Sequence, residues 1–147
     1  MRKPTQILIF LYRKTKTTYE YCIFKRKKEQ FYQAISGGVE NNETLIETVK
    51  RELKEEIGVE TNKIYKLSTI SSIPKIDIIK ENIWNNVYVI KEYTFAIEIN
   101  NEKIILSQEH EKYEWLNYEE AYKKLKYDSN KTSLWELNER LLNNDLK

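Results

Sequence analysis

The chain has 147 residues, of which 40% are hydrophobic and 33% are charged, and its formal net charge is +2. This length and composition exclude a disordered chain, and we expect one globular domain over residues 1–147. No apolar run approaches the roughly 20 residues that cross a bilayer, no signal-peptide pattern follows the basic N-terminus, and the small net charge provides no polycationic surface for nucleic acid. We therefore expect a cytoplasmic protein that binds neither membranes nor nucleic acid polymers.

The chain contains one cysteine, Cys22, and one histidine, His110. A single cysteine cannot form an internal disulfide, and these two side chains are too few for a zinc site. We expect Cys22 to be a buried strand residue and His110 to be a structural hydrogen-bonding group rather than a catalyst. Any metal site in this chain must therefore use oxygen ligands.

The first two predicted elements are strands over Gln6–Tyr12 and Tyr19–Phe24, both rich in β-branched and aromatic residues. The polar segment Arg13–Thr18 between them predicts a hairpin, and both strands are expected to be largely buried. Four cations follow at Lys25–Lys28. For the last two lysines of this group the pattern favours a turn exposed to water.

A short strand over Phe31–Ser36 is predicted to lead to Gly37 and Gly38, from which a loop continues toward an acidic helix. Two adjacent glycines allow the backbone to approach a ligand closely and to present its amide or carbonyl groups. Gly37 and Gly38 are therefore candidate substrate-binding residues.

The acidic helix is predicted over Leu45–Ile57. Thr44 followed by Glu47 fits a capping box, and Gly58 supplies a stop at the C-terminal end. Apolar residues recur at helical spacing and fill one stripe of a helical wheel. This stripe consists of Leu45, Ile46, Val49, Leu53 and Ile57.

Three carboxylates, Glu52, Glu55 and Glu56, lie along the edge of the apolar stripe, whereas Lys50 and Lys54 face water. Like charges three and four residues apart destabilise a helix, and partial burial adds a desolvation cost, so a positive partner is expected to offset the repulsion. Hard divalent cations bind such carboxylates together with phosphate oxygens. Taken alone, the same charges also fit an acidic helix face exposed to water.

Two further strands are predicted over Lys63–Ser72 and Asn86–Ile99, and the second shows a long hydrophobic alternation. The connection between them contains Trp84, and loops beside a rigid sheet commonly carry substrate contacts. Trp84 is therefore either a stacking partner for a base or a partly buried structural residue.

Two helices are predicted in the C-terminal part. Asn117 and Glu120 fit a capping box for a helix over Tyr118–Leu125, and spaced leucines give an amphipathic helix over Leu134–Leu142. The segment Asp128–Asn130 is expected to cap this last helix, with a substrate contact by its asparagine as the alternative. Strands before and after an acidic helix, followed by C-terminal helices, predict an α/β fold of the mixed α+β type.

The segment Gly37–Val59 also resembles the signature of the Nudix hydrolases. This resemblance implies an α/β/α sandwich with a mixed β-sheet, and it implies hydrolysis of a nucleoside diphosphate linked to another group. Every fixed position of the Nudix box is matched, by Gly37, Glu43, Arg51, Glu52, Leu53, Glu55, Glu56, Gly58 and Val59.

Carried over residue by residue, the resemblance implies that Glu52, Glu55 and Glu56 are catalytic and bind Mg²⁺, or Mn²⁺ in its place. Arg51 and Glu43 are expected to orient the helix and the loop before it. None of these roles follows from hydrophobic periodicity.

Arg26 and Glu109 are site candidates on the same basis. In Nudix proteins an arginine at the end of this strand often reaches the substrate phosphates, so Arg26 is expected to bind substrate. Glu109 begins the string Glu-His-x-x-Tyr-x-Trp-Leu, which resembles the branch that contains dATP and dihydroneopterin triphosphate pyrophosphohydrolases. In that branch an acidic residue of this loop supplies a further metal ligand or the catalytic base, and Glu109 matches its position.

The branch resemblance implies a small-molecule substrate, a nucleoside or pterin triphosphate, which is cleaved to a monophosphate and pyrophosphate. Two alternatives stay open: a Nudix hydrolase of dinucleoside polyphosphates or oxidised nucleotides, and a nucleotide-sensing Nudix-like domain without turnover. The complete set of helix glutamates favours turnover. The oligomeric state, the bond that is cleaved and the choice of base between Glu109 and a helix glutamate are left open by the sequence.

Overall fold

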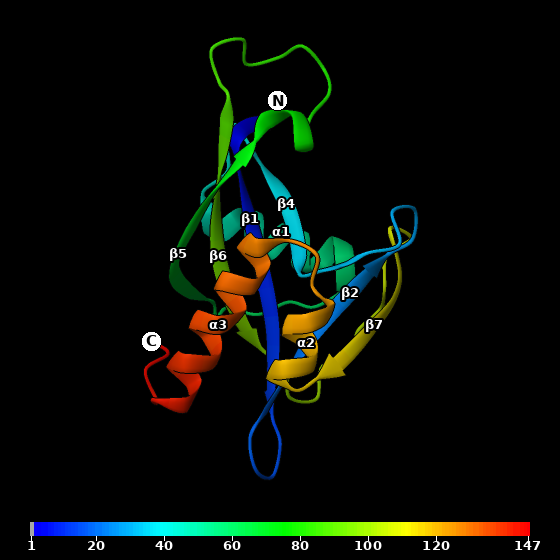
Figure 1. The fold of residues 1–147 in the computed structure, drawn as a ribbon, viewed down its shortest axis with the longest axis vertical. Helices are drawn as coiled ribbons and strands as arrows, with labels where there is room; N and C mark the ends of the chain where they lie inside the picture. Colours follow the sequence, from blue (N-terminus) through cyan, green and yellow to red (C-terminus); the bar gives the residue numbers. More distant parts are fainter. Residues whose placement is uncertain (1) are drawn as a thin grey trace.

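The computed structural model describes residues 2–147, and Figure 1 shows a twisted sheet with helices on both faces. The strands are β1 (Arg2–Lys14), β2 (Tyr19–Arg26), β3 (Tyr32–Gln33), β4 (Ile35–Glu40), β5 (Tyr65–Pro74), β6 (Val89–Glu98) and β7 (His110–Leu116). The helices are α1 (Leu45–Ile57), α2 (Tyr118–Lys124), α3 (Asp128–Leu142) and the short 3-10 helix η1 (Lys75–Asp77). Within residues 2–147, no helix combines the length and apolar composition needed to cross a membrane.

Strand β1 is the centre of the sheet, because three other strands pair with it. It runs parallel to β6, from Thr5 opposite Lys91 to Tyr12 opposite Glu98. It is antiparallel to β4 over its first part and to β2 over its last part. The sheet is therefore mixed, and the predicted hairpin between the first two strands is confirmed.

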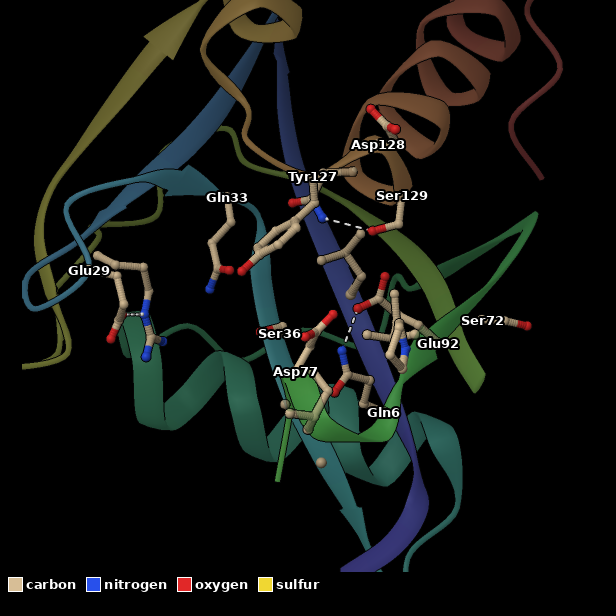
Figure 2. A pocket seen from close by; sticks show the side chains of 18 of the residues that line it. Gln6, Glu29, Gln33, Ser36, Ser72, Asp77, Glu92, Tyr127, Asp128 and Ser129 are labelled. Atoms are coloured by element: carbon tan, nitrogen blue, oxygen red, sulfur yellow. Dashed lines mark hydrogen bonds and ion pairs between the residues drawn. The ribbon is translucent and has the colours of Figure 1, made fainter. Parts of the chain in front are cut away.

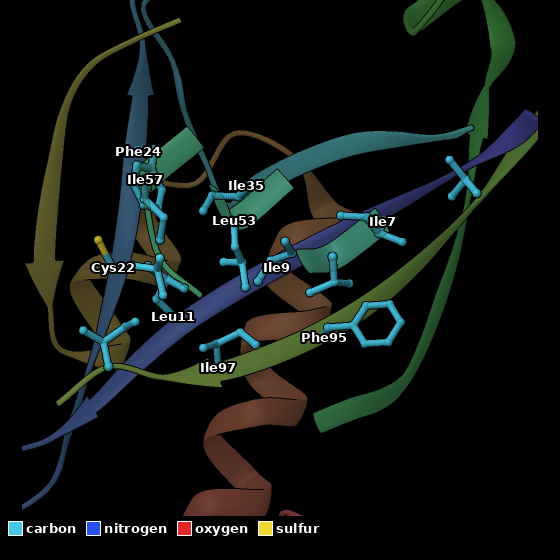
Figure 3. Close-up of a cluster of buried hydrophobic side chains, with 14 residues drawn as sticks. Ile7, Ile9, Leu11, Cys22, Phe24, Ile35, Leu53, Ile57, Phe95 and Ile97 are labelled. Carbon is cyan, nitrogen blue, oxygen red and sulfur yellow. The ribbon is translucent and has the colours of Figure 1, made fainter. Parts of the chain in front are cut away.

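Side chains alternate along β1 and divide the core into two clusters. Ile7, Ile9 and Leu11 pack on one face with apolar residues of α1 (Figure 3). Leu8 and Phe10 pack on the other face with residues of α2 and α3. This arrangement confirms the α/β/α sandwich that the resemblance implies.

Helix α1 has the predicted bounds because its start and stop signals are local. The Thr44 hydroxyl accepts a hydrogen bond from the Glu47 amide, the Glu47 carboxylate accepts one from the Thr44 amide, and Gly58 has a left-handed φ of 69°. Ile46 departs from the prediction, since it is 41% exposed while Thr48 occupies the buried side of the first turn.

Gly37 and Gly38 lie in a strand and not in the predicted loop. They belong to β4, where they pair with Ile7 and Gln6 of β1. Glycine is depleted in strands, so the local sequence gives no sign of this pairing. Strand β7 is likewise absent from the predicted elements, and it is defined by its pairing with β2.

Helix α3 begins at Asp128 and not at Leu134, so Asp128–Asn130 forms its first turn instead of a cap before it. The buried Asn130 side chain accepts a hydrogen bond from the Ala34 amide, which ties this turn to the entry of β4. The predicted cap of α2 is confirmed in part, because the Asn117 side chain accepts a hydrogen bond from the backbone of the third helical residue.

Three smaller predictions agree with the structure. Cys22 is buried in β2, and Lys27 and Lys28 are exposed in the turn that follows it. Trp84 is half-buried, and the Arg2 guanidinium lies 5.9 Å from the centre of its ring, which fits the structural alternative for this tryptophan.

Candidate active site beside the acidic helix

Glu52 lies buried between α1 and the paired glycines of β4. A Cβ atom on Gly37 would lie 2.2 Å from the Glu52 carboxyl carbon, so the absence of a side chain at Gly37 makes room for this carboxyl group. Burial raises the pKa of Glu52 to about 7 against the opposing effect of Arg51, and the charges of Glu55 and Glu56 raise it further. An added positive charge would therefore stabilise the ionised form of Glu52.

Arg51 joins the helix to the loop and strand that precede it. Its Nε and Nη2 donate to the Glu43 carboxylate at 2.6 and 2.9 Å, and Nη2 also donates to the Gly38 carbonyl at 2.9 Å. Its Nη1 donates to Glu52 at 2.9 Å and to Glu55 at 3.4 Å. The hydrogen bonds from Arg51 hold the pKa of Glu43 at about 2. These contacts fit the orienting roles that the resemblance implies for Arg51 and Glu43.

Glu56 is buried beside the loop that precedes β7. Its Oε2 accepts a hydrogen bond from the Ser107 hydroxyl at 2.8 Å, and His110 Nδ1 lies 3.2 Å from the same oxygen. Burial acts to raise the pKa of Glu56, but the contacts with His110 and Ser107, helped by the charge of Arg26, outweigh it and lower the pKa. Glu56 is therefore ionised near neutral pH. His110 is buried as expected of a structural residue, but neither of its ring nitrogens makes a hydrogen bond within residues 2–147, so the expected hydrogen-bonding role is not seen.

The predicted metal ligands do not converge on one point in this structure. Glu52 is directed toward Gly37, Glu56 is directed toward Ser107, and the Glu55 side chain is 55% exposed. Within residues 2–147, no three His, Cys, Asp or Glu side chains gather closely enough to hold a metal ion. The donor chemistry still fits Mg²⁺. The acidic ridge of Glu52, Glu55 and Glu56 offers only carboxylate oxygens, and burial disfavours the ionised form of Glu52 even with Arg51 beside it.

Arg26 and Glu109 face each other beside this ridge. Arg26 Nε donates to Glu29 at 2.7 Å, and Arg26 Nη1 lies 3.6 Å from the Glu109 carboxylate. The Glu109 side chain is 62% exposed, and its backbone carbonyl accepts a hydrogen bond from the Lys27 amide. The structure therefore places the Glu109 carboxylate next to Arg26.

A cavity of about 660 Å³ extends over the sheet next to the first turn of α3 (Figure 2). Arg26, Gly37 and Gly38 all line it, so the three residues predicted to bind substrate share one cavity. The four predicted carboxylates do not line it, although Glu52 lies directly behind Gly37. Phosphates held in this cavity would therefore pass close to the acidic ridge.

Four buried polar residues form part of the remaining lining, and sequence analysis singles out only Asn130 among them, as an alternative substrate contact. Gln6, Gln33 and Glu92 are nearly fully buried there, and Asn130 lines the same space. Gln6 lies on β1 next to the buried Leu8, and Glu92 lies on β6 between the buried Ile90 and Thr94. A buried polar residue calls for an explanation. That pattern is the sequence signal that could have found them.

Comparison with known proteins identifies the family of this chain. The NUDIX domain family model matches residues 2–136. A Listeria monocytogenes protein assigned to the NUDIX hydrolases has 38% sequence identity, with 99% of each chain covered and a TM-score of 0.89. The chain is also similar to Escherichia coli dihydroneopterin triphosphate pyrophosphohydrolase, with 21% identity, 97% of each chain covered and a TM-score of 0.78.

A third similar structure is a binary complex of a Caenorhabditis elegans Ap4A hydrolase, with 18% identity, 95% of this chain and 99% of that chain covered, and a TM-score of 0.70. No curated protein matches the chain. At these low identities the E. coli and C. elegans structures show the fold alone. The family model and the L. monocytogenes protein, together with the complete Nudix box on α1, establish that this chain belongs to the Nudix hydrolase family.

Proposed function

We propose that this Nudix hydrolase cleaves a nucleoside or pterin triphosphate, of the dATP or dihydroneopterin triphosphate type, to a monophosphate and pyrophosphate. The observation that carries the proposal is the position of Arg26, Gly37 and Gly38 on one cavity with Glu52 behind the first glycine. The cavity, about 660 Å³, falls within the range of sites for small molecules. The Glu-His-x-x-Tyr-x-Trp-Leu string and the likeness to the E. coli pyrophosphohydrolase support the choice of substrate.

In the proposed reaction the oxygen of a water molecule bonds to the α-phosphorus, the α–β anhydride bond breaks, and pyrophosphate leaves. A carboxylate accepts the proton that the water loses. Glu56 is ionised near neutral pH, and Glu109 is exposed to solvent beside Arg26, so these two are the candidates for the base.

Glu52, Glu55 and Glu56, with Glu109 as a further ligand, would hold Mg²⁺ or Mn²⁺. When bound, the cation neutralises charge on the phosphate oxygens. Arg51 restrains Glu52 and Glu55 through its Nη1, so the ridge keeps its orientation while Glu55 remains accessible.

Arg26 would bind the phosphates at the same end of the cavity. Its Nε contacts Glu29 and its Nη1 faces Glu109, whereas Nη2 donates no hydrogen bond within the part of the chain that the structure describes. A guanidinium that keeps a free edge can bind phosphate oxygens directly.

A phosphate-release assay tests the proposal. A panel of nucleoside triphosphates, dihydroneopterin triphosphate, dinucleoside polyphosphates and oxidised nucleotides is incubated with Mg²⁺, and released phosphate is measured by malachite green with and without added inorganic pyrophosphatase. We expect a signal that requires pyrophosphatase and is abolished by EDTA. Phosphate release without pyrophosphatase, or activity confined to dinucleoside polyphosphates, would contradict the proposal.

A further inference from the structure

The end of the cavity away from Arg26 contains three polar side chains joined by hydrogen bonds, those of Arg2, Gln6 and Glu92, which have no role in the proposed reaction. Arg2 Nη2 donates to Gln6 Oε1 at 3.0 Å, and Gln6 Nε2 donates to Glu92 Oε2 at 2.5 Å. Figure 2 shows Gln6 and Glu92 opposite Glu29, the partner of Arg26, across the cavity. The strand register explains the contact, because Gln6 of β1 lies directly beside Glu92 of β6.

Among these hydrogen-bonded side chains, Glu92 has a buried oxygen that lacks a hydrogen-bond partner in the described part of the chain. It is only 3% exposed although it lines the cavity, and its Oε1 has no hydrogen-bond partner within residues 2–147. Burial raises the pKa of Glu92, against the smaller opposing effects of Gln6 and Ser129. A buried carboxyl oxygen without a partner is costly, and such groups are rare in folded proteins unless a ligand supplies the missing contact.

The chemistry of the missing partner follows from the hydrogen bonds already made. Gln6 uses its carbonyl for Arg2 and its amide nitrogen for Glu92, so it cannot rotate without losing both. Gln6 already donates to Oε2 of Glu92, so Oε1 is the oxygen that lacks a donor among the described residues. N–H donors from a ligand would favour the ionised carboxylate over the protonated form that burial favours, because an ionised carboxylate accepts hydrogen bonds and donates none. Arg2 Nε is also buried without a partner and adds a donor on the same wall.

We propose that Glu92, held by Gln6, selects substrates that carry a 2-amino-4-oxopyrimidine ring, as guanine and pterins do. The adjacent ring N–H and amino group donate to the Glu92 carboxylate, and the oxo group suits the donor offered by Arg2. Adenine presents a ring nitrogen acceptor beside its amino group, and that lone pair would face a carboxylate oxygen unfavourably. This inference rests on the proposed function and narrows it, because it assigns the base-binding end of the same cavity and favours the pterin triphosphate over dATP.

Binding of products without turnover tests the inference separately from catalysis. GMP, IMP and AMP are titrated into the protein in EDTA by calorimetry, and GMP differs from IMP only by the 2-amino group. We expect GMP to bind about tenfold or more tightly than IMP, and AMP to bind most weakly, because a site built around a hydrogen bond rejects a ligand that lacks it. Equal binding of GMP and IMP, or no binding of either, overturns the inference even when triphosphates are hydrolysed.

Two substitutions assign the preference to Glu92. Glu92→Gln keeps the shape and the contact with Gln6 but presents a neutral amide, so we expect GMP and IMP to bind within about threefold of each other. Asp77→Asn is the matched control, because Asp77 is an exposed carboxylate on the same cavity, and it should keep the preference for GMP. Retained preference in Glu92→Gln, or equal loss in Asp77→Asn, contradicts the role of Glu92.

Folding of each variant is checked by circular dichroism. Glu92→Asp is a second variant, which keeps the charge but withdraws the carboxylate by one methylene. We expect it to weaken GMP binding while IMP binding changes little, and unchanged GMP binding contradicts the inference.

If the panel of triphosphates gives no pyrophosphate but GMP is still preferred, the proposed reaction fails and the binding inference stands.

Discussion

The three candidate metal ligands of α1, Glu52, Glu55 and Glu56, lie within five residues but have different surroundings, so their substitution should affect activity and folding differently. Glu55 is exposed and is held only at 3.4 Å by Arg51, whereas Glu56 is buried with Ser107. A side chain that makes few contacts within the protein can bind a ligand, and its substitution should change the stability of the fold little. Glu55 is therefore the cleanest position at which to separate catalysis from folding.

Glu55→Gln or Glu56→Gln is expected to lower kcat by at least about a hundredfold, because each substitution removes a metal ligand or the base. Steady-state kinetics at saturating Mg²⁺ measure the effect, and circular dichroism verifies the fold. Glu60→Gln is the control, since Glu60 is exposed beyond the helix and contacts only Lys54 among the ion pairs of residues 2–147. Turnover within a few-fold of the parent in either helix variant would show that the acidic ridge is not the metal site.

Arg26→Ala is expected mainly to raise KM for triphosphates, because a guanidinium on phosphate makes similar contacts in the ground state and the transition state. Lys27→Ala should have a much smaller effect, since Lys27 is exposed and does not line the large cavity. Initial-rate kinetics over a range of substrate concentrations separate KM from kcat. Equal changes in the two variants would indicate that Lys25–Lys28 form only a turn exposed to water and that Arg26 has no special role in binding the substrate.

Glu109→Gln is expected to lower kcat by about a hundredfold if Glu109 is the base or an added ligand, and to alter the acid limb of the pH profile of kcat. Glu111→Gln is a better control than Glu114→Gln. Glu111 is exposed and contacts Lys25, whereas Glu114 accepts a hydrogen bond from Tyr32 and contributes to packing. Parental kcat with an unchanged acid limb would move the base to the helix.

At the scale of helices and strands, the side chain of Glu136 links α3 to β5 by hydrogen bonds. Its carboxylate accepts hydrogen bonds from the amides of Ser68 and Thr69, from the Thr69 hydroxyl, and from Arg140. Burial acts to raise the pKa of Glu136, but the hydrogen bonds from Thr69, Ser68 and Arg140 outweigh it, and the pKa is lowered. The contact therefore holds the helix that carries the first-turn residues of the cavity.

Glu136→Gln is expected to lower the free energy of unfolding by about 1 to 3 kcal/mol at neutral pH, as loss of charge-assisted hydrogen bonds should. Because the folded pKa lies below the unfolded value, the contribution of Glu136 is present above that unfolded value and is lost as the pH falls through the folded pKa. Urea unfolding of parent and variant should thus differ most at neutral pH and converge in acid, below the usual pKa of 4.5. Glu139→Gln, on the same helix, should leave stability unchanged; a gap independent of pH would argue against the ionised contact.

Local signals explain which elements are predicted correctly. Thr44, Glu47 and Gly58 define α1 because each acts within its own turn. Gly37 and Gly38 are placed in a strand by β1, a distant segment, and no nearby residue encodes that pairing. The helix that begins at Asp128 escapes prediction for a related reason, since Asn130 is held there by a hydrogen bond to a backbone amide far along the chain.

The residues of the candidate site also fall into two groups: those that a local motif identifies, and those that only the folded sheet brings together. The helix glutamates and Arg51 belong to one contiguous motif, so a sequence pattern can identify them. Gln6 and Glu92 meet only because β1 and β6 are adjacent in the sheet. Whether the glutamate side chains converge on a cation depends on rotamers and charge, which a motif does not encode.

In the whole molecule, the acidic ridge sits against a packed core, so cation binding should be linked to folding. Mg²⁺ that binds the folded chain and not the unfolded chain raises Tm according to its free concentration and affinity. We expect Tm, measured by differential scanning fluorimetry in the absence of substrate, to rise with Mg²⁺ in the parent and in Glu60→Gln. The rise should be much smaller in Glu56→Gln, and an equal rise in all three proteins would place the cation elsewhere.

The parallel pairing of β1 with β6 also bears on how the chain is made. During synthesis β1 is translated before β2 and β6, and it can form a hairpin with β2 soon after, but its other edge has no partner until β6 has been translated. An apolar strand with an open edge is prone to pair with other chains. The number of residues between β1 and β6 therefore sets how long the open edge of β1 can pair with other chains while the protein is being translated.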